Sequence, residues 1–447
     1  MRWLLALATA ASLAAAPAQA AKEVFAHVIL GNTNALTVTD WEADMKLAKA
    51  SSIDAFVLNV AQGDQNNDVS LSNAFTAAKN AQFKLFFSFD YAASPNGAFD
   101  KAGVKALMDK FGGDEAYFKV KEQGNKPLVS TFEGPKNADD WTELKASTNC
   151  FFIPDWSSLG PAKAAAAAGG VVDGLFSFDA WPVGPTNKTT TTDKEYQAAL
   201  SGKAFMMPVS PWFFTNLPTT LSKNWMWHSD GLWDTRWDQV MEVQPDFVEI
   251  LTWNDYGESH YIKPITKKDE YDGLLKTFGA PLDYVTNNPH QGWLKFLPFY
   301  IAQYKAGGKV PAVAKEEAVL YYRTAPATAC PNGGTTGNNP AFGQTAVPPE
   351  QMAEDSIFFA ALLTSDADVK VTVTVGATQI PATFNKPPAA GAGTPGVYRG
   401  AVPMGTNTGA VSLTVTRGGT TVAEAKGGPE LSTTCQNNVQ NWNGVAV

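Results

Sequence analysis

Eight short apolar runs alternate with helix-like segments over roughly 285 residues, and this alternation constrains the fold more than any other feature of the sequence. The runs carry β-favouring residues, and the segments between them have apolar residues at helical spacing. A doubly wound sheet shows the same alternation but seldom continues through eight regular units. The sequence therefore predicts the α/β class and a (β/α)8 TIM barrel. The predicted strands are 24–30, 53–60, 83–89, 127–132, 151–153, 172–178, 204–209 and the run that begins at Phe247.

Several local signals mark the predicted helices. Thr39 and Glu42 have the spacing of a capping box for the first helix, and Asn137 is expected to cap a later one. Trp233 and Trp237 lie four residues apart on a predicted helix, so we interpret them as core residues rather than sugar platforms. A closing helix is predicted over 291–304.

Polar and aromatic residues follow the predicted strands. In (β/α)8 barrels the carboxyl ends of all strands converge on one face, where active sites lie. We therefore expect these side chains to surround one site. They are Asn32, Asn59, Asp90, Glu133, Asp155, Trp156, Asp179, Trp181, Trp212, Asp255 and Glu258.

The stretch 247–262, which reads FVEILTWNDYGESHYI, carries the strongest signal for chemistry. It begins as a buried strand and changes abruptly to polar and aromatic residues. Asp255 and Glu258 lie three residues apart there, and burial among such neighbours would shift their pKa values. The stretch thus predicts a catalytic carboxylate pair. Its neighbours are Trp253, Asn254, Tyr256 and His260.

Other candidate residues also have structural interpretations. Asp90 and Asp179 can cap the helices that follow them, and Asp155 can accept hydrogen bonds in a turn. Glu133 can be a solvated loop residue. His27 lies inside the first strand, where it can be structural or can line the site.

Carboxylates beside Trp and Tyr are suited to glycoside hydrolysis, which needs one protonated carboxyl and one carboxylate that acts as base or nucleophile. The four His have no metal-ligand spacing, and no Gly-rich phosphate loop of the expected form occurs. We therefore expect neither a metal nor a cofactor. The net charge of −9 argues against binding to nucleic acid or to an anionic membrane surface.

The pattern changes at about residue 310. Short strand-like runs at 319–322, 357–363, 369–375 and 411–415 are separated by turns rich in Gly, Pro, Thr and Asn. This pattern is typical of a β-sandwich. We therefore predict a barrel over 21–310 and a C-terminal β-sandwich accessory domain over 311–447.

Residues 1–20 are predicted to be a secretory signal peptide. Arg2 precedes an apolar run, and Ala18-Gln19-Ala20 forms a cleavage site. A membrane anchor is the weaker interpretation, because the run is short for a spanning helix. The mature protein is therefore expected to be secreted, extracellular and soluble.

Secretion permits disulfides and glycosylation. Cys330 and Cys435 lie in turn-rich surroundings of the C-terminal region, and we predict that they pair. Cys150 begins an apolar strand and is expected to be a buried free thiol. Asn187 begins a glycosylation sequon in a Thr-rich loop.

Six segments in order resemble the fungal α-1,3-glucanases, or mutanases, of glycoside hydrolase family 71. They read FAHVILGNT, DWEADM, KLFFSFD, LVSTFEG, FFIPDW and ILTWNDYGESHYI, and they cover the whole predicted barrel. The C-terminal region also resembles the accessory domain of this family. The resemblance implies a secreted, monomeric enzyme that hydrolyses α-1,3-glucan with inversion at the anomeric carbon.

The resemblance also implies roles for residues. Asp255 and Glu258 match the catalytic pair, with Glu258 as general acid and Asp255 as general base, and Asp90 matches a further required acid. Inversion calls for carboxyl groups about 6.5–9.5 Å apart. Two alternatives are a non-catalytic carbohydrate-binding protein and a glycosidase for another α-linkage, such as an α-mannoside. The residues expected to bind substrate are His27, Asn59, Glu133, Asp155, Trp156, Asp179, Trp181, Trp212, Trp253, Asn254, Tyr256 and His260.

Overall fold

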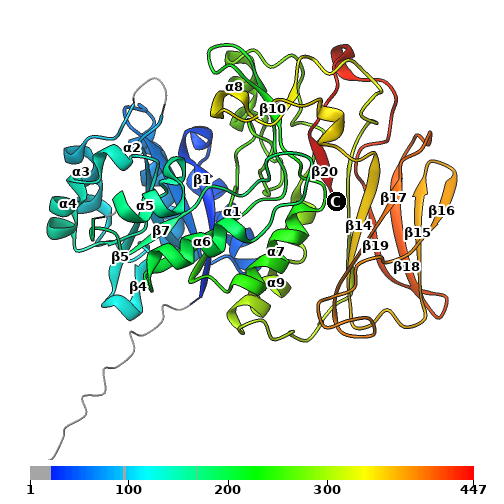
Figure 1. Cartoon of the computed structure of the whole chain (residues 1–447), viewed down its shortest axis with the longest axis horizontal. Coiled ribbons are helices and arrows are strands. Elements are labelled where there is room, and N and C mark those ends of the chain that lie inside the picture. The colour runs from blue at the N-terminus through cyan, green and yellow to red at the C-terminus, as the bar shows by residue number, and fades with distance from the viewer. Residues whose placement is uncertain (1–21, 94–96, 168) are drawn as a thin grey trace, which may run out of the picture.

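The computed structural model describes residues 22–93, 97–167 and 169–447, so the predicted signal peptide at 1–20 lies outside the described residues. The chain forms a curled parallel sheet with helices around it, and antiparallel sheets follow at the C-terminal side (Figure 1). None of the described helices is long and apolar enough to cross a membrane.

The parallel sheet contains the eight predicted strands. The first strand, β1, pairs with both β2 and the last strand, β11, so the two ends of the alternating region lie side by side. Between β6 and β7 the contact is narrow: Asp155 forms single parallel bridges to Phe132 and Phe176. The strands are β1 (Glu23–Ile29), β2 (Ala55–Ala61), β3 (Lys84–Asp90), β5 (Lys126–Phe132), β6 (Phe151–Phe152), β7 (Gly174–Phe176), β8 (Ala204–Val209) and β11 (Phe247–Ile250). A short strand, β4 (Lys119–Val120), pairs antiparallel with β5.

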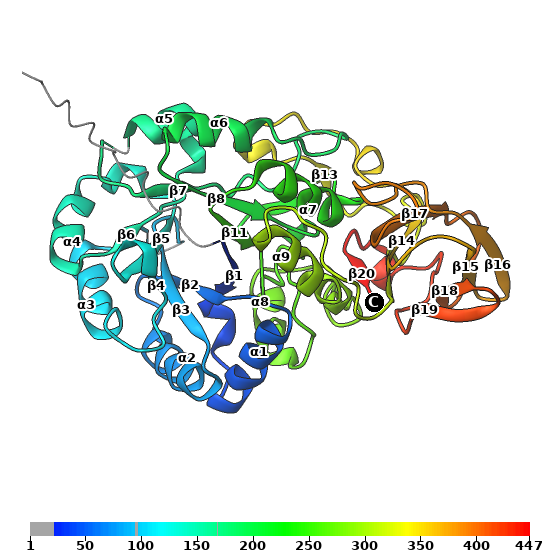
Figure 2. The same cartoon turned by 90° about the horizontal axis from the view of Figure 1, so that it is seen from below.

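Helices pack around the outside of this sheet, as the end-on view shows (Figure 2). Their apolar sides and the buried strands form one hydrophobic cluster, in which Trp233 and Trp237 are buried as predicted. The helices are α1 (Val38–Ala50), α2 (Asn67–Ala81), α3 (Lys101–Phe111), α4 (Asp140–Thr148), α5 (Pro161–Ala167), α6 (Thr191–Leu200), α7 (Leu232–Val243), α8 (Asp272–Thr277) and α9 (Leu297–Lys305).

Three predicted helix signals are wrong. The capping box of α1 is formed by Thr37 and Asp40, because the helix begins two residues earlier than Thr39 implies. Asn137 lies in a 3-10 turn and caps no helix, since α4 begins only after Asp139. The closing helix is split, because Pro298 lacks an N–H and is accommodated only in a first turn, where α9 begins.

A second small sheet was not predicted. The hairpin of β9 (Phe214–Leu217) and β10 (Lys223–Met226) follows β8, and β10 also pairs with β13 (Thr336–Gly337). Since β13 comes from the C-terminal region, residues on both sides of the predicted boundary at 310 share one core cluster. Cys330 and Cys435 form a disulfide in this region, and Cys150 is a buried free thiol.

The rest of the C-terminal region forms two antiparallel sheets that share a separate hydrophobic cluster. One sheet has the order β17 (Gly396–Pro403), β14 (Ser356–Leu363), β12 (Glu317–Arg323) and β20 (Gly444–Ala446). The other has the order β16 (Thr378–Ala382), β15 (Val369–Val375), β18 (Val411–Arg417) and β19 (Thr420–Lys426). The strands β16, β17, β19 and β20 were not predicted. Pro interrupts the pattern of β16, Gly interrupts that of β17, β20 is three residues long, and β19 carries few β-favouring apolar residues.

Candidate active site

The loop that follows β11 brings two carboxylates together. Asp255 Oδ1 accepts a hydrogen bond from the Glu258 N–H at 3.1 Å, and the Asp255 N–H donates to Thr252 Oγ1 at 2.8 Å. His260 Nε2 lies 3.1 Å from Glu258 Oε2 and 3.7 Å from Asp255 Oδ2. One oxygen of each carboxylate and this nitrogen lie within 4.8 Å of one another. The tight turn thus holds the two carboxylates beside each other and beside His260.

The pKa values of the two carboxylates are shifted in opposite directions, and Lys223 on β10 acts mainly on Glu258. Burial alone would raise the pKa of Glu258, but the Lys223 ion pair and the His260 hydrogen bond lower it well below its usual range. Burial and the charge of Glu258 raise the pKa of Asp255, and His260 and Lys223 only partly oppose this. Asp255 is therefore the preferred position for a shared proton. The three donors could approach one cation, but Lys223 already supplies positive charge beside Glu258.

Replacing Lys223 with Met is expected to raise the pKa of Glu258, because it removes the positive charge that stabilises the carboxylate. The limb of the pH–rate profile that Glu258 controls should then move to higher pH. The profile of kcat/KM against pH measures this shift. The control is Lys203→Met, because Lys203 lies far from the pair and donates a hydrogen bond to the Val172 carbonyl. An unchanged profile would contradict the role assigned to Lys223.

Asp90 lies at the end of β3 in the same electrostatic environment. Burial raises its pKa, although the Ala92 N–H, which donates to it at 2.8 Å, the charge of His27 and a hydrogen bond from Asn59 oppose the shift. The charge of Asp90 also contributes to the raised pKa of Lys223. The structure therefore gathers Asp90, Asn59 and His27 near the pair, as the strand ends predicted.

The sequence analysis missed Glu249, which lies inside the apolar run of β11. Its Oε1 is 2.6 Å from His27 Nδ1, and both side chains are almost fully buried. Burial raises the pKa of Glu249 more than His27 lowers it. A single Glu between Val248 and Ile250 was the available signal, because an acid in a buried strand requires a partner.

Aromatic side chains line a cleft of about 720 Å³ beside the pair. Trp181 stacks on Trp227, with ring centroids 5.3 Å apart, and lies at the same distance from the His260 ring. Glu133 and Asp179 line the cleft as predicted, and Glu133 accepts hydrogen bonds from the Ser158 N–H and hydroxyl.

Six residues predicted to contact substrate are buried beneath the site instead. A side chain with almost no exposed surface cannot contact a sugar, so these six residues cannot bind substrate directly in this structure. They are Asp155, Trp156 and Tyr256 at 0%, Trp253 and Asn254 at 1%, and Trp212 at 2% exposure.

Three of these side chains fix the loop after β11. Asn254 accepts a hydrogen bond from the Ile29 N–H at 2.8 Å and donates to the Ile29 carbonyl at 3.1 Å. Trp253 Nε1 donates to Asp44 at 3.2 Å, and the Tyr256 hydroxyl donates to Glu270 at 3.1 Å. The loop is therefore anchored to β1 and to the surrounding helical segments.

The other three support neighbouring walls. Asp155 accepts a hydrogen bond from the Ser157 N–H at 3.0 Å, and Trp156 lies edge-on to Phe152 in the core. Trp212 Nε1 donates to the Trp442 carbonyl at 3.3 Å. His260 and His27 are also buried, so they act on the site through the carboxylates that they contact.

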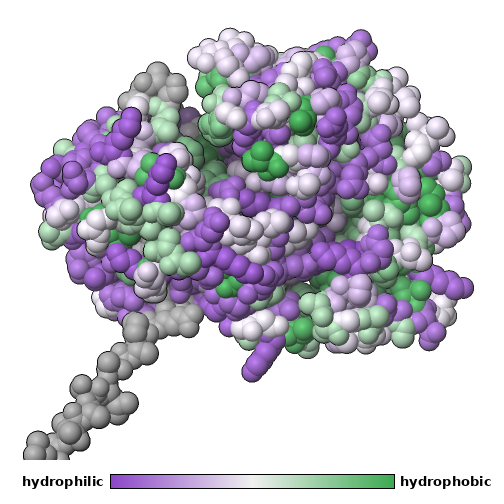
Figure 3. Space-filling view, in the orientation of Figure 1, coloured by the Kyte–Doolittle hydropathy of each residue, from purple (hydrophilic) through white to green (hydrophobic). Residues whose placement is uncertain are grey.

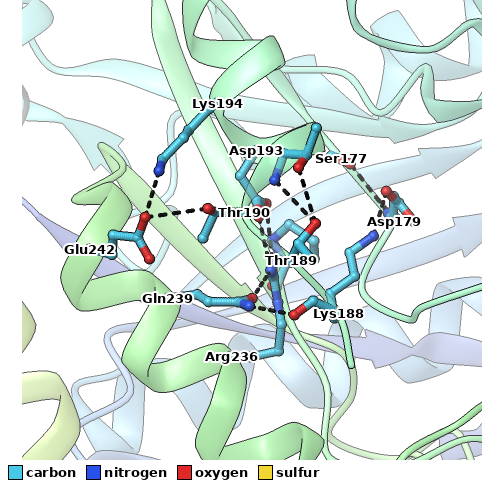
Figure 4. A network of polar contacts seen from close by, with 12 residues as sticks. Ser177, Asp179, Lys188, Thr189, Thr190, Asp193, Lys194, Arg236, Gln239 and Glu242 are labelled. Atoms are coloured by element: carbon cyan, nitrogen blue, oxygen red, sulfur yellow. Dashed lines mark hydrogen bonds and ion pairs between the residues drawn. The ribbon is translucent and has the colours of Figure 1, made fainter. Parts of the chain in front are cut away.

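A network of polar contacts holds Asp179 in place (Figure 4). Lys188 Nζ lies 2.6 Å from Asp179 and 3.3 Å from the Trp181 carbonyl, and Gln239 donates to the Lys188 carbonyl at 2.6 Å. Arg236 on α7 binds both carboxylate oxygens of Asp193 on α6 at 2.9 Å. Next to this network, Asn187 is exposed, and its Oδ1 is 3.3 Å from His228 Nε2.

Comparison with known proteins identifies the family. The chain is 36% identical over 358 residues to a mutanase of Penicillium rubens, covering 78% of this chain and 74% of the relative. It is 34% identical over 404 residues to a glucan endo-1,3-alpha-glucosidase of Schizosaccharomyces pombe, covering 86% of each. The solved GH99 endo-alpha-mannosidase of Bacteroides thetaiotaomicron aligns with a TM-score of 0.47 at 13% identity, covering 64% of this chain and 98% of that one. The family model described as "Glycosyl hydrolase family 71" matches residues 20–447, and the chain therefore belongs to this family.

Proposed function

We propose that this protein is an endo-acting glycoside hydrolase that cleaves α-1,3-glucosidic bonds within α-1,3-glucan. The names of the relatives, a mutanase and a glucan endo-1,3-alpha-glucosidase, support the substrate. The observation that carries the proposal is the Asp255–Glu258 pair, because the pKa values of its two members are shifted in opposite directions and the pair lies beside an aromatic cleft. Glycoside hydrolysis needs this difference.

The reaction uses one proton of the pair. A protonated carboxyl donates its proton to the glycosidic oxygen as the bond to the anomeric carbon breaks. The carboxylate accepts a proton from water as the water oxygen bonds to that carbon, so the pair again holds one proton at the end. Water attack from the opposite face inverts the anomeric centre.

Inverting enzymes hold their carboxyl groups about 6.5–9.5 Å apart to admit the attacking water, and retaining enzymes hold them about 5–5.5 Å apart. The anomer released first decides the stereochemistry. We expect the β-anomer, observed by proton NMR during the first turnovers on an α-1,3-glucan oligomer, and initial release of the α-anomer would establish retention instead.

Activity itself is tested by the release of reducing sugars from insoluble α-1,3-glucan. We expect release from this polymer and none from an α-mannan of similar solubility. Binding to the glucan without release would support the non-catalytic alternative. Release from α-mannan alone would replace the proposed substrate.

The remaining organisation follows from the sequence pattern. We propose that residues 1–20 are removed on secretion and that the extracellular enzyme acts as a monomer without a cofactor. The strand β1 pairs with β11, and Asp155 bridges the narrow contact between β6 and β7, which supports a complete (β/α)8 barrel. The shared cluster of the two C-terminal sheets supports a β-sandwich accessory domain. Exposure of Asn187 supports its glycosylation in a eukaryotic host.

A further inference from the structure

A loop from the C-terminal region reaches the cleft beside the catalytic pair. Asn338 and Asn339 are almost fully buried at its base, and the Asn339 side chain accepts a hydrogen bond from the Ala341 N–H at 3.0 Å. The loop then forms a 3-10 turn over Pro340–Phe342, with Gly343 in a left-handed conformation. Its backbone is therefore held by specific side-chain contacts.

The base of the loop is bonded to the aromatic wall of the cleft. Gln344 Oε1 accepts hydrogen bonds from Trp227 Nε1 and from the Asn339 N–H, each at 2.8 Å. Asn338 Oδ1 accepts from the Gly184 N–H at 2.8 Å. These contacts fix the position of the loop relative to Trp181, which stacks on Trp227.

Phe342 is 74% exposed at the tip of this loop, although its backbone is fixed. Among the described residues, the exposed large hydrophobics are Val69, Val183, Val310 and Phe342, and both Val183 and Phe342 line the cleft. The space-filling view shows a hollow on this face with hydrophobic residues near its edge (Figure 3). Exposed apolar surface beside a cleft marks a site for a ligand with apolar faces.

The cleft lies beside the catalytic pair. Trp181 lines it and lies 5.3 Å from His260, whose Nε2 contacts Glu258. A chain that occupies the pair can extend past the edges of Trp181 and Trp227, which are 6% and 7% exposed, toward the exposed ring of Phe342. Glucose rings suit such a path, because their C–H faces pack on aromatic rings while their hydroxyls reach the Glu133 and Asp179 carboxylates.

We propose that Phe342 is a stacking platform for a glucose unit of α-1,3-glucan at a position remote from the cleaved bond. The C-terminal region thus completes the substrate cleft and strengthens binding of long chains. This inference rests on the proposed function. It assigns to Phe342 a role in chain-length preference and not in the chemical step.

The test compares Phe342→Ala, Phe342→Trp and Val69→Ala with the unmodified enzyme on soluble α-1,3-glucan oligomers of increasing length. Removing the ring should raise KM for the longest oligomers about tenfold, because a stacked Phe buries most of its apolar surface. The loss should grow with oligomer length, and kcat should change much less than KM. Phe342→Trp should keep the low KM, and Val69→Ala, which removes another exposed hydrophobic side chain on α2, should leave it unaltered.

The outcomes separate this inference from the proposed function. If the unmodified enzyme releases no sugar from any α-1,3-glucan, the proposed function fails. If it is active but Phe342→Ala matches Val69→Ala at every length, the platform is absent. An equal loss at all lengths, or a loss in kcat alone, would likewise overturn the assignment of Phe342 to a remote position.

Discussion

Replacing Glu258 with Gln should lower kcat on α-1,3-glucan by about 10²–10⁴-fold, the contribution typical of a positioned acid or base. The amide keeps the shape of the side chain but can neither ionise nor transfer the proton. Asp255→Asn should cause a loss of similar size for the same reason. Reducing-sugar release measures both losses, and unchanged thermal unfolding would show that the variants remain folded. Near-normal turnover in both variants would exclude the pair from catalysis.

The same variants decide which carboxylate is the acid. A glucosyl fluoride derived from an α-1,3-glucan oligomer needs no protonation of its leaving group, so an enzyme that lacks only its acid still hydrolyses it. The raised pKa of Asp255 beside the lowered pKa of Glu258 favours Asp255 as the proton carrier and predicts that Asp255→Asn retains fluoride hydrolysis. The family resemblance gives the acid role to Glu258 and predicts that Glu258→Gln retains it.

The candidate catalytic loop after β11 was predictable because several local signals coincide there. An apolar run ends, two acids follow three residues apart, and the other strand ends carry similar residues. Parallel strands joined by helices must place those ends on one face. This reasoning located Asp90, Asp255 and Glu258 together without knowledge of any contact.

Other parts of the site depend on contacts that are distant in sequence. Lys223 lies on a hairpin inserted after β8, and only the Pro-Thr-Thr turn between two short runs suggests that hairpin. Phe342 also lines the cleft, although it lies more than a hundred residues after Lys223 in the sequence. No local pattern indicates which surface such a loop covers.

The burial of the aromatic residues was also not predictable from position alone. A Trp just after a strand can point into the cleft, as Trp181 does, or into the layer beneath it, as Trp156 does. The choice depends on the backbone angles of the loop and on partners such as Asp44 for Trp253. Residue type therefore identified the region of the site but not which rings a sugar can reach.

The Arg236–Asp193 pair should have the largest effect on stability of the ion pairs that support the cleft. Arg236 is fully buried, binds Asp193 at two oxygens and donates to the Pro208 carbonyl on β8 at 2.8 and 3.1 Å. It therefore links α7, α6 and the sheet behind Trp181. Its loss would leave the Asp193 charge buried and unpaired.

Arg236→Leu should lower the free energy of unfolding by about 3–5 kcal/mol, which is the typical cost of removing one partner of a buried ion pair. Adding Asp193→Leu should recover part of this loss, because the second change removes the unpaired charge. Lys194→Ala is the control, since its ion pair with Glu242 is exposed and such pairs contribute about 0–1 kcal/mol. Chemical denaturation followed by Trp fluorescence measures all three variants. Equal midpoints for Arg236→Leu and Lys194→Ala would show that the buried network does not support the cleft wall. A lower midpoint for Arg236→Leu together with a raised KM would connect the stability of this network to substrate binding through Lys188 and Asp179.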